Sequence, residues 1–372
     1  MTTSIVSEGH LRQFQLDREG QTPFQLIDPS GQLTPAGESI GVDVGLARDL
    51  YTDMVMARCL DKEALSLQRQ GELSLWLMSW GQEAAQVGSI RALRSSDMVF
   101  PSYREHGAAL CRGITPADLM RQWKGAAHSG WDPTVSRFHI YSLVLGTQTL
   151  HATGYAAGAA LEKTDEIVAT YFGDGAASQG DVNEAFNWAA AGSLPVLFFC
   201  QNNQWAISTP TAKQMRTPLH VRAAGFGLDA YHVDGNDVMA VHAVTRQAAD
   251  RIREGGGPAL IEAQTYRFGG HSSSDDPKRY RSEDEFAAWE LKDPLTRMES
   301  FLRGSGVSDE EFFGPLVAET ESFARAVREA CKKIVGPQMS ELFDRVYAEP
   351  HSSLQMERAA HLAHAQSLGP VI

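Results

Sequence analysis

Apolar runs alternate with amphipathic stretches along most of the chain, and this alternation predicts strands joined by helices. The run at 167–172 is rich in β-branched and aromatic residues and predicts a buried strand that ends at a Gly-Asp-Gly turn, 173–175. Apolar residues then recur at helical spacing over 178–191, and a second buried strand is predicted at 196–200. Because strand–helix–strand units form right-handed crossovers, we expect both strands to run parallel and to end at the same edge of the sheet.

The rest of the chain continues this pattern. Further helices are predicted at 43–70, after Gly81, and at 116–127, 142–162 and 238–254, and further buried strands at 231–233 and 258–266. Asp237 is expected to cap the helix that follows it, so its carboxylate needs no catalytic role. From residue 283 onward, helices with charged faces predict a C-terminal helical layer with a role in packing and assembly. The polar, proline-interrupted residues 1–42 predict an extended arm that packs on a partner subunit.

These elements predict an α/β protein whose mostly parallel sheet carries helices on both faces. The predicted divisions are an N-terminal arm at 1–42, a main domain at 43–350 and a C-terminal tail at 351–372. Hydrophobic residues make up 43% and charged residues 21% of the chain, which is the balance of an ordinary globular protein. A chain of 372 residues with this composition can bury a sizeable core.

Charge and cysteine usage argue against several classes of protein. The net charge of −13, with no basic stripe to offset it, argues against nucleic acid as a partner. The sequence contains no run of about 18 apolar residues, so no membrane span is predicted. The 4 cysteines are far apart and include no CxxC pair, so neither a zinc site nor a disulfide framework is expected. The first residues are acidic and lack the apolar core of a secretory signal, so we expect a cytoplasmic protein.

Asp174 and the pair Asn202-Asn203 follow the two predicted strands, so we expect them to converge at one edge of the sheet. Glycines let a ligand approach the backbone closely, and the helix that follows them offers free N–H groups that suit phosphate. The Asp174 carboxylate and the Asn203 amide oxygen are a hard, weakly charged set that suits Mg²⁺ bridged to phosphate. If the Gly-Asp-Gly stood alone, an ordinary crossover with a glycine turn would be the better interpretation.

The spacing of these residues favours a specific cofactor. Asn203 lies 29 positions after Asp174 in a strand–helix–strand context, and this arrangement resembles the thiamine-diphosphate motif. The resemblance implies that Asp174, Asn203 and the backbone carbonyl of Trp205 bind Mg²⁺.

Over residues 40–350 the chain resembles the alpha subunits of the thiamine-diphosphate-dependent 2-oxo acid dehydrogenases. This resemblance implies the thiamine-diphosphate-binding fold. The stretches FFCQNNQWAISTPT, VDGNDV and TYRFGGHSSSDDPKRYRS make it most similar to the branched-chain 2-oxo acid type. This implies oxidative decarboxylation of acids such as 2-oxoisovalerate, with transfer of the acyl group to a lipoyl arm. A pyruvate dehydrogenase alpha subunit is one alternative, and a non-catalytic assembly subunit with a relic site is another. A nicotinamide oxidoreductase would need a GxGxxG after the first strand, which this sequence lacks.

The resemblance also assigns cofactor contacts. Tyr103 and Arg104 match the pair that contacts the diphosphate, and Leu145 matches a residue whose backbone meets the aminopyrimidine. The four-residue turn matches the segment that binds diphosphate and metal, and it consists of Gly173, Asp174, Gly175 and Ala176.

Two further groups follow from the same resemblance. His271 matches the histidine that reaches the diphosphate and assists acyl transfer, and its place after a buried strand leads us to expect a group that titrates near neutrality. Ser142, Thr147 and Gln148 match a loop that holds a monovalent cation, K⁺, in branched-chain members.

Three positions depart from the branched-chain pattern. Gln201 stands where relatives can carry an arginine to the diphosphate, Leu143 replaces a serine, and the loop 128–141 around His139 is shorter than usual. The chain also shows no second cofactor-binding half with the glutamate that activates the aminopyrimidine. The resemblance therefore implies a separate beta subunit in a heterotetramer, and a lipoyl-bearing dihydrolipoyl acyltransferase as a further partner.

Overall fold

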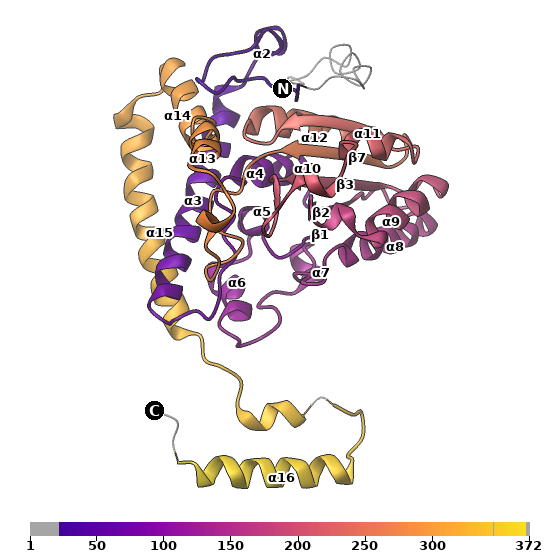
Figure 1. Cartoon of the computed structure of the whole chain (residues 1–372), viewed down its shortest axis with the longest axis vertical. Helices are drawn as coiled ribbons and strands as arrows, with labels where there is room; N and C mark the ends of the chain where they lie inside the picture. The colour runs from indigo at the N-terminus through magenta and orange to yellow at the C-terminus, as the bar shows by residue number, and fades with distance from the viewer. Residues whose placement is uncertain (1–21, 345, 370–372) are drawn as a thin grey trace.

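A five-stranded parallel sheet lies at the centre of the computed structural model, which describes residues 22–344 and 346–369 (Figure 1). The strand order is β1-β2-β3-β7-β6. The strands are β1 (Met98–Phe100), β2 (Val168–Gly173), β3 (Val196–Asn202), β6 (Asp229–Asp234) and β7 (Ala259–Gln264). Every residue of β3 is buried, as expected for a central strand covered by helices on both faces.

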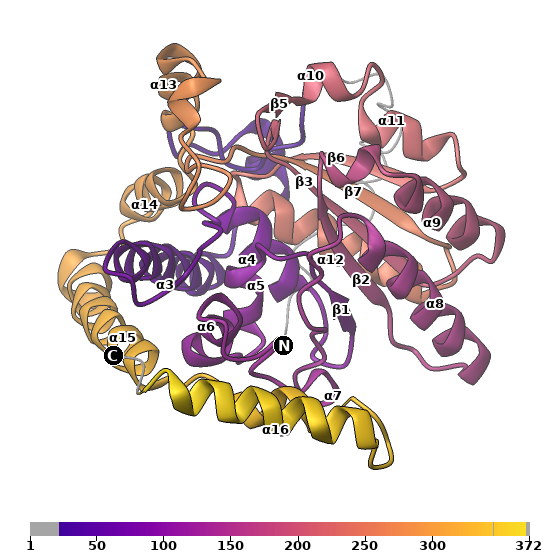
Figure 2. The same cartoon turned by 60° about the horizontal axis from the view of Figure 1, so that its bottom comes forward.

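Helices cover both faces of the sheet (Figure 2). Side chains alternate across a strand, so Leu197 and Phe199 enter one hydrophobic cluster whereas Phe198 and Cys200 enter another. The first cluster includes residues of α3 (Val44–Arg69), α4 (Glu83–Ala92), α5 (His106–Cys111) and α12 (Val238–Arg253). The second includes residues of α8 (Thr147–Glu162), α9 (Gly180–Ala191) and α11 (Leu219–Ala224). The predicted parallel α/β architecture is confirmed.

An outer helical layer packs on α3 (Figure 1). It consists of α14 (Pro294–Gly304) and α15 (Gly314–Lys333), and α15 also contacts α6 (Pro116–Trp123). The remaining elements are short and lie mostly in loops: α2 (Pro35–Ile40), α7 (Pro133–Ser136), α10 (Thr211–Gln214), α13 (Glu283–Glu290), the antiparallel pair β4 (Trp205–Ala206) and β5 (Thr209–Pro210), the 3-10 turns η1 (Ala176–Ser178), η2 (Pro277–Arg279) and η4 (Met339–Phe343), and the π-helical turn η3 (Asp309–Phe313). The predicted C-terminal helical layer is thus present.

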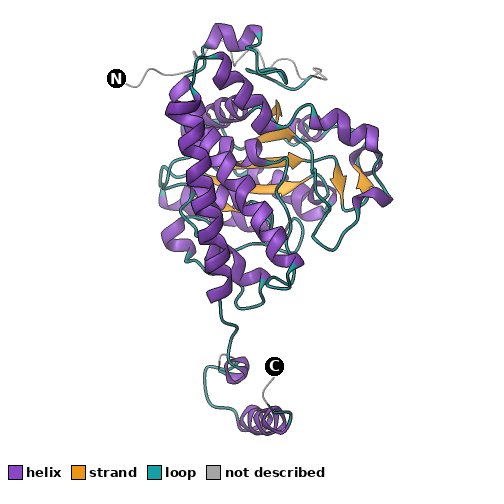
Figure 3. Ribbon diagram, turned by 90° about the vertical axis from the view of Figure 1, so that its left-hand side faces the viewer, coloured by secondary structure: helices purple, strands orange, loops and turns teal. Residues whose placement is uncertain are grey.

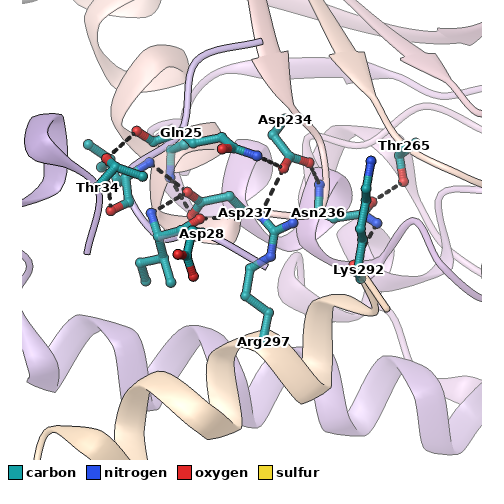
Figure 4. Close-up of polar contacts among 12 residues, drawn as sticks. Gln25, Asp28, Thr34, Asp234, Asn236, Asp237, Thr265, Lys292 and Arg297 are labelled. Carbon is teal, nitrogen blue, oxygen red and sulfur yellow. Dashed lines mark hydrogen bonds and ion pairs between the residues drawn. The ribbon is translucent and has the colours of Figure 1, made fainter. Parts of the chain in front are cut away.

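The chain before α3 differs from the extended arm predicted for 1–42. Residues 1–21 lie outside the described residues, but Leu26 and Ile27 are buried in the core of this same chain. Their backbone N–H groups both donate to Asp237 Oδ2, at 2.7 Å (Figure 4). Asp237 Oδ1 accepts from the first turn of α12, which confirms the predicted cap. The VDGNDV stretch therefore fastens the N-terminal segment to the body.

The last helix, α16 (Ser352–Ser367), lies apart from the body in two perpendicular views (Figure 1, Figure 3). It contacts η4 and has no buried residue. The predicted divisions at residues 42 and 350 stay predictions. None of the helices in the described part of the chain has the length and apolar character needed to cross a membrane.

Candidate functional site

The carboxyl ends of β2 and β3 bring the predicted site residues together. Gly173 pairs with Gln201 in the parallel register, so Asp174 and Asn202 are the next residues at the same edge. The Thr211 hydroxyl lies 2.9 Å from Asp174 Oδ2 and 3.2 Å from Asn202 Oδ1 and joins the two side chains. The expected convergence of Asp174 with Asn202-Asn203 is therefore present in the structure.

The glycine turn provides space rather than an unusual backbone conformation. Neither Gly173 nor Gly175 has a positive φ. A Cβ on Gly173 would meet only the Gln201 carbonyl oxygen, at 3.9 Å, whereas a Cβ on Gly175 would lie 2.7 Å from the Cβ of Ala206. Ala176 begins η1, and α9 follows, so free N–H groups lie just beyond the open space at Gly173. This is the geometry of an anion cradle.

Asp174 is the buried carboxyl group at this turn. Burial raises the pKa of its carboxyl above the usual range, and hydrogen bonds from Thr211 and Gln214 oppose that shift. A divalent cation beside the carboxylate would favour its charged form further. No group of three or more histidine, cysteine, aspartate or glutamate side chains within residues 22–344 and 346–369 could hold a metal ion. A metal here would need amide and backbone oxygens beside Asp174.

Two oxygens of that kind lie just after β3. Asn203 Nδ2 donates to Gln82 Oε1 at 2.7 Å, and Asn203 Oδ1 accepts from the Trp205 N–H at 3.2 Å. The Trp205 carbonyl accepts from Arg267 Nη1 at 3.0 Å. Both oxygens retain a lone pair for a metal, although the Trp205 carbonyl is shared with a guanidinium.

Arg104 and Tyr103 both contact His271. Arg104 Nη1 donates to the Met78 carbonyl at 2.6 Å, and its Nη2 donates to the His271 carbonyl at 2.8 Å and approaches His271 Nδ1 at 3.4 Å. The Tyr103 ring lies edge-on to the His271 ring, with centroids 6.2 Å apart. Because a guanidinium only donates, Nδ1 is the acceptor and Nε2 carries the proton of the neutral imidazole.

The expectation that His271 titrates near neutrality is wrong. Burial, together with the positive charges of Arg104 and Arg267, lowers its pKa from 6.5 to about 4, and Asp275 opposes the shift only in part. Asp275 Oδ2 accepts from the His271 backbone N–H at 2.6 Å and holds the loop in place. His271 is therefore neutral at pH 7.

The loop before α8 carries the other predicted contacts. Leu145 is 39% exposed and follows the exposed Leu143 and Val144, so this loop presents apolar side chains to the surface. Ser142 Oγ donates to the Val144 carbonyl, and Thr147 is the first residue of α8. Gln148 is buried, and within the part of the chain that the structure describes its Oε1 has no hydrogen-bond partner. That free acceptor is compatible with a cation in this loop.

Gln201 is occupied by the protein itself. Its Nε2 donates to Glu105 Oε1 at 2.7 Å, and its Oε1 accepts from Gln86 at 3.1 Å. Burial raises the pKa of Glu105, and hydrogen bonds from Ser102 and Gln201 oppose this. Gln201, which departs from the branched-chain pattern, therefore stabilises the loop that carries Arg104 through its hydrogen bond to Glu105.

The residues present fit a diphosphate with a divalent cation. The space at Gly173 is open, Arg104 and Arg267 supply positive charge, and Asp174 and Asn203 supply oxygens. Two buried donors, Gln82 Nε2 and Arg267 Nε, lack a partner among the described residues. Unpaired buried donors cost free energy, so they mark places where a ligand oxygen or water belongs.

Sequence reasoning missed four side chains that contact the predicted ones: Gln82, Thr211, Gln214 and Arg267. Thr211 and Arg267 lie within the stretches that carry the family resemblance, but their spacing from Asp174 gives no signal of contact. Gln82 lies 121 residues before Asn203, and only the tertiary fold brings the two together.

Comparisons with known proteins show the family to which the chain is similar. The family model for the dehydrogenase E1 component matches residues 51–338. The chain is 42% identical over 340 residues to 3-methyl-2-oxobutanoate dehydrogenase subunit alpha of Mycobacterium tuberculosis (strain ATCC 25618 / H37Rv), covering 90% of this chain and 92% of the relative. It is 34% identical over 359 residues to the mitochondrial 2-oxoisovalerate dehydrogenase subunit alpha of Homo sapiens, covering 93% of this chain and 80% of the relative. The corresponding subunit alpha 2 of Arabidopsis thaliana is also 34% identical, over 352 residues, covering 91% of this chain and 74% of the relative.

Proposed function

Because the chain belongs to the dehydrogenase E1 component family, we propose that it is the alpha subunit of a branched-chain 2-oxo acid dehydrogenase. The proposed reaction is oxidative decarboxylation of 3-methyl-2-oxobutanoate and related acids, with transfer of the acyl group to the lipoyl arm of a dihydrolipoyl acyltransferase. Relatives from a bacterium, a plant and a mammal carry names for this substrate, and each covers at least 90% of this chain. The cytoplasm stays our expectation for its location.

The cofactors we propose are thiamine diphosphate and Mg²⁺. Thiamine diphosphate, when bound, supplies the electron sink for loss of carbon dioxide from a 2-oxo acid. Asp174, Asn203 and the Trp205 carbonyl would hold Mg²⁺, and the turn from Gly173 to Ala176 would cradle the diphosphate. The open space at Gly173 and the unpaired donor Arg267 Nε, among the described residues, support this assignment. A K⁺ ion in the loop of Ser142, Thr147 and Gln148 is a secondary proposal, supported by the unpaired Gln148 Oε1 among the described residues.

The chain's own groups orient ligands and handle protons. Arg104 is buried and fixed by two carbonyls, so it presents a positive charge with little entropy left to lose. His271 can donate a hydrogen bond from Nε2 to an anionic oxygen, and a bound diphosphate would favour the imidazolium form, which can give a proton to a leaving sulfur. Leu145, which is 39% exposed, offers an apolar side chain that suits a branched substrate. We propose His271 as the catalytic residue of acyl transfer.

We propose a beta subunit as an obligatory partner in a heterotetramer. The chain supplies a cradle for diphosphate and metal. None of the site residues assigned above is a glutamate that could activate the aminopyrimidine. The exposed apolar loop at 143–145 is a surface that a partner subunit would cover. The isolated chain is therefore expected to be inactive.

The observation that carries the substrate assignment is the 42% identity over 90% of the chain to a subunit named for 3-methyl-2-oxobutanoate. The deciding experiment is the ratio of kcat/KM for 2-oxoisovalerate and pyruvate on the complex reconstituted with its beta subunit. Each buried methylene contributes about 0.8 kcal/mol, so two additional carbons supply a preference of roughly tenfold. A ratio below one would establish the alternative, a pyruvate dehydrogenase alpha subunit. A complex that binds no thiamine diphosphate would establish a non-catalytic assembly subunit.

A further inference from the structure

The side chain of Gln82, immediately before α4, contacts the proposed metal ligand Asn203. Gln82 is 1% exposed, and its Oε1 accepts from Asn203 Nδ2 at 2.7 Å. It is the N-cap of α4 by position, yet its side chain makes no capping hydrogen bond. Within residues 22–344 and 346–369 its Nε2 has no partner. A glutamine buried this deeply with one contact serves that contact rather than its own helix.

Gln82 and Gln86 connect α4 to the end of β3 by hydrogen bonds. Gln86, one helical turn after Gln82, donates to Gln201 Oε1 at 3.1 Å, and Gln201 lies two residues before Asn203. Four helical residues rise about 6.0 Å and two strand residues about 6.6 Å, so the two pairs match in spacing. The match fixes the position of α4 along β3 and so the distance from Gln82 to Asn203.

The backbone beneath Gln82 is also held from several sides. Gly81 has a φ of +95°, and a Cβ there would lie 2.2 Å from the Tyr266 carbonyl oxygen. The Gly81 carbonyl accepts from Thr265 Oγ1 at 2.7 Å, and the Gln82 N–H donates to the Ser79 carbonyl at 2.8 Å. The backbone of Gln82 is therefore held in place beside Asn203.

A carboxamide has a donor end and an acceptor end, and only the acceptor end can bind a metal ion. With Gln82 Oε1 as its acceptor, Asn203 turns Nδ2 toward α4 and keeps Oδ1, which accepts from the Trp205 N–H, on the side left for the metal. We propose that Gln82 is a positioning residue that sets the orientation of the Asn203 amide for Mg²⁺ binding. This inference rests on the proposed function, because it assumes that Asn203 is a metal ligand.

The test measures metal affinity rather than turnover. Mn²⁺ replaces Mg²⁺ in the reconstituted alpha–beta complex with saturating thiamine diphosphate, and free Mn²⁺ is read by electron paramagnetic resonance. Gln82→Met keeps the length and burial of the side chain but removes the acceptor, so Mn²⁺ affinity should fall about tenfold, the effect of one buried hydrogen bond. Gln82→Glu keeps an acceptor for Asn203 Nδ2, so its affinity should stay at or above the wild-type value.

The second variant separates positioning from a structural role. If Gln82 only supported the fold, a buried carboxylate would do more damage than methionine, and Gln82→Glu would be the weaker binder. In an Asn203→Ala background, Gln82→Met should cause no further loss, because its effect passes through Asn203. Ser89→Ala is the matched control: Ser89 is buried on α4 and lies 2.8 Å from the Tyr171 hydroxyl, away from Asn203. Its Mn²⁺ affinity should equal that of wild type.

Three results would overturn the inference: Mn²⁺ affinity of Gln82→Met within twofold of wild type, a tenfold loss that persists without Asn203, or a Gln82→Glu complex that binds more weakly than Gln82→Met. If Gln82→Met fails to assemble, Gln82→Glu decides alone, and an affinity below one tenth of wild type counts against positioning. A wild-type complex that binds no Mn²⁺ with thiamine diphosphate refutes the proposed function itself, and that result is distinct from the other three.

Discussion

Gly173→Ala should leave the protein folded but weaken cofactor binding. Gly173 ends β2 with an ordinary backbone, and its added Cβ would meet nothing nearer than the Gln201 carbonyl oxygen, at 3.9 Å. The substitution therefore costs the ligand-free protein nothing in contacts. In parallel strands, paired residues point to the same face, so this methyl group lies on the face where Gln201 reaches Glu105, beside the Arg104 loop.

The magnitude follows from the space that the methyl group fills. If the diphosphate occupies the opening at Gly173, the methyl group overpacks the complex at a cost of about 1–3 kcal/mol. Affinity for thiamine diphosphate should then fall by about 5- to 150-fold. Gly175→Ala should differ, because its Cβ would lie 2.7 Å from the Cβ of Ala206 and must displace β4 even without ligand. We expect Gly175→Ala to lower both the Tm and the affinity.

Gly180→Ala is the matched control for both variants. Gly180 is the first residue of α9, and a Cβ there would meet nothing within 4 Å. Calorimetric titration of the reconstituted complex with thiamine diphosphate and Mg²⁺, together with thermal melts of the free chain, separates the three variants. If Gly173→Ala binds within twofold of wild type, the opening at Gly173 is not where the diphosphate lies. If its Tm falls as far as that of Gly175→Ala, the space around Gly173 is not open.

Other consequences can be tested on the same complex. Asp174→Ala should abolish Mg²⁺-dependent cofactor binding in calorimetry without lowering the Tm of the free chain, since burial already disfavours its charge; unchanged affinity would remove it from the site. His271→Ala should slow acylation of a lipoyl domain by about 10²- to 10⁴-fold, and a wild-type rate would exclude it from acyl transfer. The His271 pKa is about 4 in the folded chain against 6.5 ordinarily, so the unfolded chain binds more protons between these values and stability falls as pH drops from 6.5 toward 4. His271→Asn should remove part of that fall in urea melts at pH 7 and pH 5, and an unchanged difference would contradict the shift. The purified chain alone should not decarboxylate any 2-oxo acid, and turnover without a beta subunit would disprove the need for that partner.

The parts of the fold that the sequence predicts are those that follow from local pattern and chain handedness. The crossover from β2 through α9 to β3 could be read from two apolar runs and a helical period between them, and the right-handed rule then placed Asp174 and Asn203 at one edge. β1 escaped prediction because three residues are too few for a periodic signal. Its place beside β2 is fixed by tertiary pairing alone.

The contacts around the site could not be predicted because they join distant segments. Arg267 Nη1 reaches the Trp205 carbonyl across 62 positions, and the Gln82 contact with Asn203 crosses 121. Residues 1–42 were predicted to form an extended arm because the segment is polar on average, but part of it packs on the body of this same chain. Leu26 and Ile27 are buried, and Asp237 accepts hydrogen bonds from the backbone N–H groups of both. Average composition does not reveal a clamp made by one carboxylate.

Burial acts in opposite directions on the two ionisable groups assigned to the site. It raises the pKa of Asp174 and lowers that of His271, so in both cases it disfavours the charged form. A divalent cation beside Asp174 and a diphosphate beside His271 would each reverse that effect, because each ligand carries the opposite charge. The ionisation of the site is thus set by its ligands. An unperturbed imidazole was therefore the wrong reference for His271: its proton balance depends on Arg104 and Arg267 before the diphosphate binds, and on the diphosphate afterwards.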